Sequence, residues 1–337
     1  MRNFNVDLLR FAGLAMIILA HAGPPPLLFQ FRNFDVPLMV MVAGISFHLS
    51  YRGEAYGTYL WKRINRLVFP VWIFLSIYFV LLYGCGFPTV FPGWGKVITS
   101  YLLLSGIGYV WIIRVFLLVA LVSPLLSKIS AQTASDARYF VMLGGAYMFY
   151  ELLADLIAPI SASFVGNVLD STLLYLLPYS LVFAIGLRLP SLSNRQVGWL
   201  CLSAAAVFVL LCGERHFESG VFVPTQVDKY PPTAYYLSFA LAGATFLWWI
   251  SDRVLAAIKS KTALGLIKFI AQNSIWIYLW HIPMVDSIHQ NFVVKYLLVF
   301  LAAVTMTFVQ VRCVERLLLP RILNAATKKR LKSLLTG

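Results

Sequence analysis

Long apolar segments alternate with short polar segments along the whole chain of 337 residues. Clusters of Pro and Gly separate several of them, notably GPPP at 23–26, GFPTVFPGWG at 86–95 and KYPP at 229–232. Helices built from these runs would cross the hydrocarbon core of a bilayer, which is about 30 Å thick. The pattern therefore predicts an all-α, polytopic membrane protein with about ten transmembrane helices. The predicted spans are Asn5 to Ala22, Val36 to Leu49, Leu67 to Gly84, Tyr109 to Leu126, Tyr139 to Ala158, Val168 to Leu187, Val197 to Gly213, Thr233 to Ile250, Leu266 to Val285, and Phe292 to Cys313.

The composition supports a membrane protein and argues against a soluble one. Hydrophobic residues make up 60% of the chain and charged residues 12%, and the mean hydropathy is +0.81. A water-soluble domain of this composition would expose large apolar patches. The net charge is +14, but nucleic-acid binding requires a basic patch on a polar domain, and the sequence contains no such domain. The positive charge therefore does not indicate a nucleic-acid-binding protein. Asp7 and Arg10 interrupt the first apolar run, so we expect a transmembrane helix there and not a cleavable signal.

Basic residues indicate the orientation in the membrane. With the N-terminus inside, 20 of the 27 Lys and Arg residues fall on the inner side, Arg2 among them, and five on the outer side. The positive-inside rule then predicts that both termini are cytoplasmic. We expect one transmembrane domain over 1–320 and a basic cytoplasmic tail over 321–337, lying against the anionic inner leaflet. The five outer cations are Arg32, Lys96, Arg215, Lys229 and Lys295.

The four cysteines show no metal-binding or redox spacing. No C-x-x-C pair occurs, so we expect neither a metal site nor a disulfide framework. They are Cys85, Cys201, Cys212 and Cys313.

Two ionisable residues in the first span lie on one helix face. Arg10 and His21 are eleven residues apart, which is three helical turns plus about 20°, or about 16 Å along the axis. Ionisable side chains at membrane depth usually face a bundle interior or a water-filled cavity. Alternatively, Asp7 and Arg10 form an interfacial pair at i, i+3 and His21 ends the helix on the outer side.

The inner loop YLWKRINRLVFP places three cations beside the third span. Lys62, Arg63 and Arg66 lie close together, and the two arginines at i, i+3 can point the same way, as in a clamp for phosphate groups. The alternative is a topology signal, because cytoplasmic loops are generally basic.

A third group lies in the segment IWIYLWHIPMV near the outer end of the ninth span. His281 lies at a depth similar to that of His21, with Tyr278 and Trp280 beside it. Two histidines on separate spans at matching depth indicate one polar cavity. A set of Trp, Tyr and His near a helix end also occurs in ordinary interfacial belts.

One buried ion pair is also predicted. Arg114 in the fourth span and Glu151 in the fifth lie at similar depths, which predicts a structural ion pair between them. Asp155, one turn further out, would extend that polar face.

Taken together, these segments resemble the integral-membrane acyltransferase family 3. Its members commonly transfer acetyl or other short acyl groups from acyl-CoA to sugars of exported or surface polysaccharides. The first span is similar to the family's motif of arginine, ten residues and histidine, which is the most specific of the matches. The segments that carry the resemblance are DLLRFAGLAMIILAH, VPLMVMVAGISF, KRINRLVFPVW, SIWIYLWHIPMV and VERLLLP.

The resemblance assigns expected roles to these residues. His21 becomes the catalytic candidate, either as general base toward an acceptor hydroxyl or as a transient acyl carrier. Arg10 would stabilise charge in the cavity or contact the CoA arm, with Asp7 orienting it. The CoA phosphates would be held by Lys62, Arg63 and Arg66. The candidates for binding the acceptor are Tyr278, Trp280, His281, Lys229 and Tyr230.

We therefore expect an enzyme of a bacterial inner membrane. It would use acetyl-CoA as donor substrate, a glycan or glycolipid hydroxyl as acceptor and the lipid bilayer as surroundings, without metal or nucleic acid. The alternatives are a transporter or flippase whose intramembrane Arg, His and Glu line a substrate route, and an inactive membrane scaffold.

Overall fold

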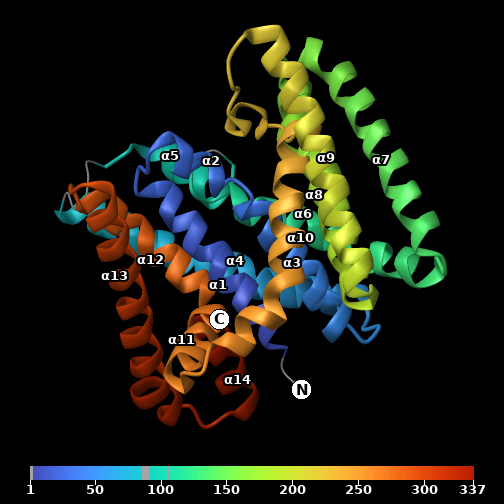
Figure 1. The fold of residues 1–337 in the computed structure, drawn as a ribbon. Coiled ribbons are helices and arrows are strands. Elements are labelled where there is room, and N and C mark those ends of the chain that lie inside the picture. The colour runs from blue at the N-terminus through green and yellow to red at the C-terminus, as the bar shows by residue number, and fades with distance from the viewer. Residues whose placement is uncertain (1–2, 86–90, 105) are drawn as a thin grey trace. The chain divides into compact units, whose positions relative to one another are not determined.

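The computed structural model describes residues 3–85, 91–104 and 106–337. Arg2, counted above among the inner cations, and positions 86–90 of the GFPTVFPGWG segment lie outside the described residues. Every regular element in the described ranges is a helix, which confirms the all-α fold (Figure 1). The α-helices are α1 (Phe4–His21), α2 (Pro26–Phe31), α3 (Asp35–Ser50), α4 (Tyr56–Cys85), α5 (Trp94–Tyr101), α6 (Trp111–Gln132), α7 (Asp136–Ile157), α8 (Phe164–Arg188), α9 (Asn194–Ser219), α10 (Ala234–Ala257), α11 (Lys261–Gln272), α12 (Ser274–Ser287), α13 (Phe292–Cys313) and α14 (Ala325–Thr336).

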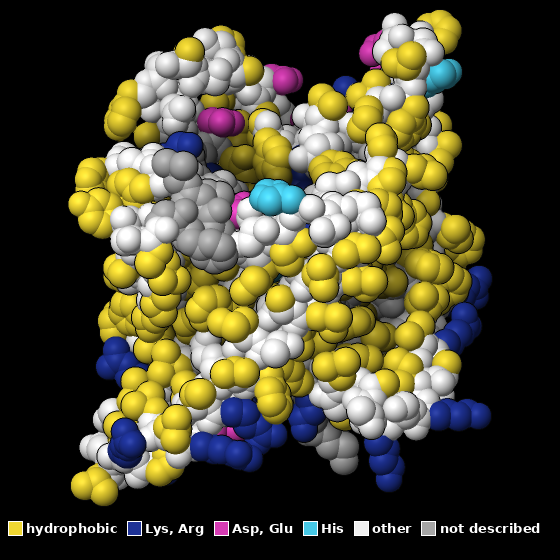
Figure 2. Space-filling view, turned by 90° about the vertical axis from the view of Figure 1, so that its left-hand side faces the viewer, with side chains coloured by type: hydrophobic (Ala, Val, Ile, Leu, Met, Phe, Trp, Pro, Cys, Tyr) yellow, Lys and Arg dark blue, Asp and Glu magenta, His cyan; other side chains and the backbone are white. Residues whose placement is uncertain are grey.

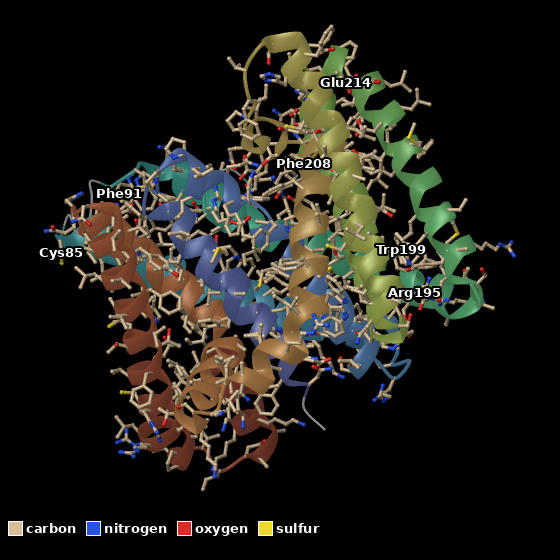
Figure 3. The ribbon with its side chains drawn as sticks, in the orientation of Figure 1. Cys85, Phe91, Arg195, Trp199, Phe208 and Glu214 are labelled. Atoms are coloured by element: carbon tan, nitrogen blue, oxygen red, sulfur yellow. The ribbon has the colours of Figure 1, made fainter. Side chains whose placement is uncertain are left out.

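Helices long and apolar enough to cross a membrane account for most of the chain. Nine such segments occur in the described ranges, and they overlap nine of the ten predicted spans. The helix α9 illustrates the pattern, since Arg195 lies near one end and Glu214 near the other, with Trp199 and Phe208 between them (Figure 3). Nineteen residues of helix separate the two charges by about 28 Å, which is close to the thickness of the hydrocarbon core. The protein is therefore a multi-pass membrane protein.

The surface has the distribution of side chains that a membrane protein requires. On the face drawn in Figure 2, hydrophobic side chains occupy a broad middle zone and Lys and Arg side chains gather beyond its lower edge. Large apolar side chains are exposed along several spans, such as Val141 and Met148 on α7 and Leu210 on α9. In a membrane, lipid tails cover this apolar surface, whereas its exposure to water would destabilise the protein.

Two predicted boundaries are wrong. The expected ninth span, Leu266 to Val285, is interrupted at Asn273, where α11 ends and α12 begins. The Phe269 carbonyl, near the end of α11, accepts from the Asn273 backbone N–H at 3.1 Å and also from the buried Asn273 side chain at 2.7 Å. The expected third span also begins earlier, because α4 starts at Tyr56 and not at Leu67.

The chain forms two compact units, which are described separately. Unit 1 comprises Met1–Leu9, Gln30–Glu54 and Leu118–Ala257, and unit 2 comprises Arg10–Phe29, Ala55–Leu117 and Ile258–Gly337. The division passes through α1, α2 and α6, each of which contributes residues to both units.

Unit 1 is built around a close approach of α3 and α8. Neither Gly44 on α3 nor Gly186 on α8 has room for a side chain, because an added Cβ would lie 2.2 Å from the Phe183 carbonyl oxygen and 2.1 Å from the Met41 carbonyl oxygen, respectively. Small residues at such positions let helix backbones pack directly against each other inside a membrane.

Replacing Gly186 with alanine is expected to destabilise unit 1. The added methyl group would meet the backbone of Met41, so α3 and α8 would have to separate, at a cost of about 1–3 kcal/mol. Thermal unfolding of the purified protein in detergent measures the effect. Gly144→Ala on α7 is the matched control, since nothing lies within 4 Å of its added Cβ. Equal unfolding midpoints for the two variants would contradict the role given to the close approach.

Glu151 lies inside unit 1 between two other elements. Its Oε1 atom accepts hydrogen bonds from the Tyr147 hydroxyl and, at 3.1 Å, from the backbone N–H of Ala234. The carboxylate therefore joins α7 to the start of α10. Arg114 belongs to unit 2, and its ion pair with Glu151 stays a prediction.

In unit 2, α12 is held by helices from two separate parts of the sequence. The helix α12 packs against α13 and α4, and its Trp280 ring meets Phe74 of α4 edge to face, with 5.8 Å between the ring centroids. The Trp280 Nε1–H also donates to Gln310 Oε1 of α13 at 2.6 Å. These contacts fix the helix that carries His281.

Candidate active site

His21 is the last residue of α1, and the sequence after it explains why the helix ends there. Gly23 adopts the left-handed conformation at φ +74°, and Pro24 and Pro25, with no N–H to donate, cannot continue the helical hydrogen bonding. The half-buried imidazole thus lies at the terminus of an apolar helix. Arg10 lies on the same unbroken helix, three turns earlier.

The structure brings His21 and His281 together within unit 2. His21 Nδ1 lies 2.9 Å from His281 Nε2, and the two rings stack with centroids 5.0 Å apart and planes 18° from parallel. His281 is fully buried, whereas His21 retains some exposure. The two residues come from α1 and α12, so the two histidines that the sequence places at similar depth are in contact. The polar cavity expected around them stays a prediction.

Hydrogen-bonding partners fix the protonation of the pair. His281 Nδ1 contacts the carbonyl oxygen of Tyr278, and a carbonyl accepts but never donates, so Nδ1 carries the hydrogen. When both rings are neutral, His281 Nε2 must then accept from the Nδ1–H of His21. The remaining ring nitrogen of His21, Nε2, carries the lone pair and is the basic atom of the pair.

Two tyrosines frame the histidine pair. The Tyr109 ring stands edge-on to His21, with centroids 4.9 Å apart, and edge-on to His281, with centroids 5.8 Å apart. The Tyr278 hydroxyl donates to the backbone carbonyl of Tyr109, while the Tyr278 carbonyl receives the His281 hydrogen bond. Tyr278 therefore positions both the second histidine and the aromatic wall.

Tyr109 is not among the residues that the sequence indicates for the site, and neither are Asp286 and Tyr78, which are linked to it in unit 2. On α12, Asp286 accepts a hydrogen bond from the Tyr78 hydroxyl at 3.1 Å and interacts electrostatically with Tyr109. Asp286 lies five residues after His281 on one helix, which is the single signal that could have drawn attention to it.

The three cations of the predicted inner loop lie instead inside a helix. Lys62, Arg63 and Arg66 belong to the first turns of α4, so the predicted loop conformation is wrong. Helical geometry places Lys62 and Arg66 about 40° apart and Arg63 about 60° beyond Arg66, which keeps all three on one side of α4. Arg63 lies over the Tyr59 ring, 5.1 Å from its centroid.

A comparison with protein families identifies the chain. A family model described as an acyltransferase domain matches residues 3–310, nearly the whole chain. The protein belongs to the acyltransferase 3 family. It is therefore a membrane acyltransferase. No curated protein and no solved structure matches the chain.

The remaining site candidates of the acyltransferase are distributed over both units. Arg10 and Trp280 belong to unit 2, Trp280 being held by Gln310, and the buried Asp7 belongs to unit 1 although it lies one turn from Arg10 on α1. Their catalytic and binding roles stay predictions.

Lys229 and Tyr230 belong to unit 1, where Lys229 is part of a buried polar cluster. The Lys229 ammonium lies 3.3 Å from Asp35 Oδ1 and 3.2 Å from Asn33 Oδ1, and Arg32 pairs with the same carboxylate at 2.8 Å. Burial lowers the pKa of Lys229, and the Asp35 carboxylate opposes that shift. The cluster attaches the loop before α10 to the start of α3. Tyr230 remains partly exposed beside it.

Within residues 3–85, 91–104 and 106–337, no group of three or more His, Cys, Asp and Glu side chains is placed to hold a metal ion. The four cysteines named above are free thiols.

Proposed function

We propose that the protein transfers an acyl group, typically acetyl, from cytoplasmic acyl-CoA to a hydroxyl of a surface or exported glycan or glycolipid, in a bacterial inner membrane. The observation that carries this proposal is the His21–His281 pair, in which the hydrogen bonds direct the basic Nε2 atom of the more exposed ring away from its partner. An acyltransferase needs a base of this kind to activate a hydroxyl.

The pair supports a complete transfer step. His21 Nε2 takes the proton of the acceptor hydroxyl while the oxygen attacks the thioester carbonyl, which forms the C–O bond. Collapse of the tetrahedral intermediate breaks the C–S bond, and the CoA thiolate leaves with the proton from His21. During the step His21 is positive, and His281 Nε2 stabilises it by accepting the Nδ1–H hydrogen bond. His281 is thus a positioning residue for His21, and Tyr278 positions His281.

The donor and the acceptor reach the site from opposite sides in this proposal. Acyl-CoA is a cytoplasmic metabolite, and Lys62, Arg63 and Arg66 on α4 supply the positive charge that its phosphates need. Arg10, about 16 Å from His21 along α1, stabilises charge between the two, and Asp7 orients it. The acceptor binds toward the outer side in this proposal. In unit 2 the contacts that we assign to it are Tyr278, Trp280 and His281, and in unit 1 Lys229 and Tyr230 stay candidates.

Release of CoA thiol by the purified protein tests the proposed function. The full chain in lipid nanodiscs is given acetyl-CoA with and without a surface glycan preparation, and free thiol and acetylated product are measured. We expect thiol release that depends on the acceptor, with one acetyl ester formed per thiol. Cells without the gene should correspondingly lack an O-acyl group on a surface glycan by mass spectrometry. Absence of both effects would contradict the proposal.

A further inference from the structure

The basic helix α14 is docked on unit 2 at its C-terminal end. The carbonyls in the last turn of a helix lack partners within the helix. In α14, the carbonyl of Leu334 accepts from Trp276 Nε1 at 3.1 Å and that of Leu335 accepts from Gln310 Nε2 at 2.7 Å. The Thr336 side chain is buried. These contacts hold α14 against α12 and α13, so its side chains have defined neighbours.

Docking brings one cation of α14 to the basic side of α4. Arg330 Nη2 donates to Asn65 Oδ1 at 3.3 Å, and Asn65 lies between Arg63 and Arg66 in the sequence. On the helical wheel of α4, Asn65 lies about 60° from Lys62, on the side opposite to Arg66. Arg330 therefore extends the row formed by Lys62, Arg66 and Arg63 at its Asn65 edge.

The charge balance around this row favours an anionic ligand. The contact of Arg330 with Asn65 is to a neutral amide, so it does not neutralise the guanidinium. The neighbouring Lys332, by contrast, forms an ion pair with Glu315 at 2.9 Å. Cations placed near each other repel. A bound ligand with several phosphate charges would be attracted by each of them and would offset that repulsion. The helix α14 begins at Ala325, beyond the residues 3–310 that the family model matches.

We propose that Arg330 of α14 is a fourth phosphate-binding cation of the donor site, which together with Lys62, Arg63 and Arg66 binds the phosphate groups at the nucleotide end of acyl-CoA. The inference rests on the proposed function, because it extends the donor site assigned there to a helix outside the family match. Phosphate groups of anionic lipids share this chemistry, so the experiment must separate the two sources.

Calorimetric titration of the full chain with free CoA tests the role of Arg330. In nanodiscs of neutral phosphatidylcholine, Arg330→Ala should weaken CoA binding about three- to tenfold, and Arg330→Glu should weaken it further. The matched control is Arg321→Ala, which removes another exposed cation just before α14. Arg63→Ala in the same assay reports on the donor site itself.

The outcomes distinguish the inference from the proposed function. Loss of affinity in Arg330→Ala, with wild-type affinity in Arg321→Ala, supports the inference. Wild-type affinity in Arg330→Ala together with a loss in Arg63→Ala overturns the inference and leaves the donor site standing. If Arg330→Ala binds CoA normally but sediments less than the wild-type protein with phosphatidylglycerol vesicles, Arg330 binds lipid phosphate. That result also overturns the inference. No CoA binding by the wild-type protein would contradict the proposed function and the inference together.

Discussion

Replacing His21 with alanine is expected to lower the rate of acyl transfer by about 10² to 10⁴, the usual cost of losing a positioned general base. The effect should fall on the catalytic step, because the ring lies at the last residue of α1, beside His281 and Tyr109, and keeps some exposure. The purified variant should therefore keep its helical content, its insertion in nanodiscs and its affinity for CoA. Turnover with saturating acetyl-CoA and acceptor measures the loss.

Two further variants make this prediction specific. His216→Ala removes an exposed histidine from α9 and should leave turnover unchanged. His281→Ala should cost less than His21→Ala, since a positioning residue is lost and not the base. It should also change the pH profile of turnover, because the partner that accepts the His21 Nδ1–H is gone. Near-normal turnover in His21→Ala would exclude it as the base.

The sequence predicts the features of this protein that depend on hydropathy and helical periodicity. Apolar runs of membrane length located nine of the crossing segments, because a backbone in lipid has to satisfy its hydrogen bonds as a helix. The same geometry placed Arg10 and His21 on one face of α1 and predicted that His21 and His281 have similar depth. In unit 2 the two rings are in contact, which similar depth allows but does not by itself predict.

The remaining features depend on tertiary contacts that a linear pattern does not contain. Tyr109 precedes α6 in a glycine-containing segment and owes its place to the Tyr278 hydroxyl, which is far away in the sequence. At the break the Asn273 side chain adds a second hydrogen bond to the Phe269 carbonyl, which the Asn273 backbone N–H already reaches, and the apolar run of the sequence continues across this position unchanged. The sequence places Lys229 in an outer loop, but the burial of its ammonium depends on Asp35 and Asn33, which the loop reaches only after folding.

The basic start of α4 is expected to bind the donor, and reversing the charge of Arg66 tests this most strongly. Arg66→Glu would put an anion where the CoA phosphates are expected, and should abolish measurable CoA binding. Removing the charge alone is milder. Charge-assisted contacts contribute about 1.5–3 kcal/mol each, so Arg63→Ala and Arg66→Ala should each weaken CoA binding by about ten- to a hundredfold in calorimetric titration.

Lys261→Ala provides the control that separates donor binding from topology. Lys261 is an exposed cation at the start of α11 and counts equally as an inner positive charge. If the cations of α4 serve only to orient the protein, all the alanine variants should bind CoA alike, because each removes one of 20 inner charges. Selective loss in Arg63→Ala and Arg66→Ala, with normal affinity in Lys261→Ala, would assign the first turns of α4 to the cytoplasmic donor. The acyl group would then have to travel outward from there to the hydroxyl that His21 activates.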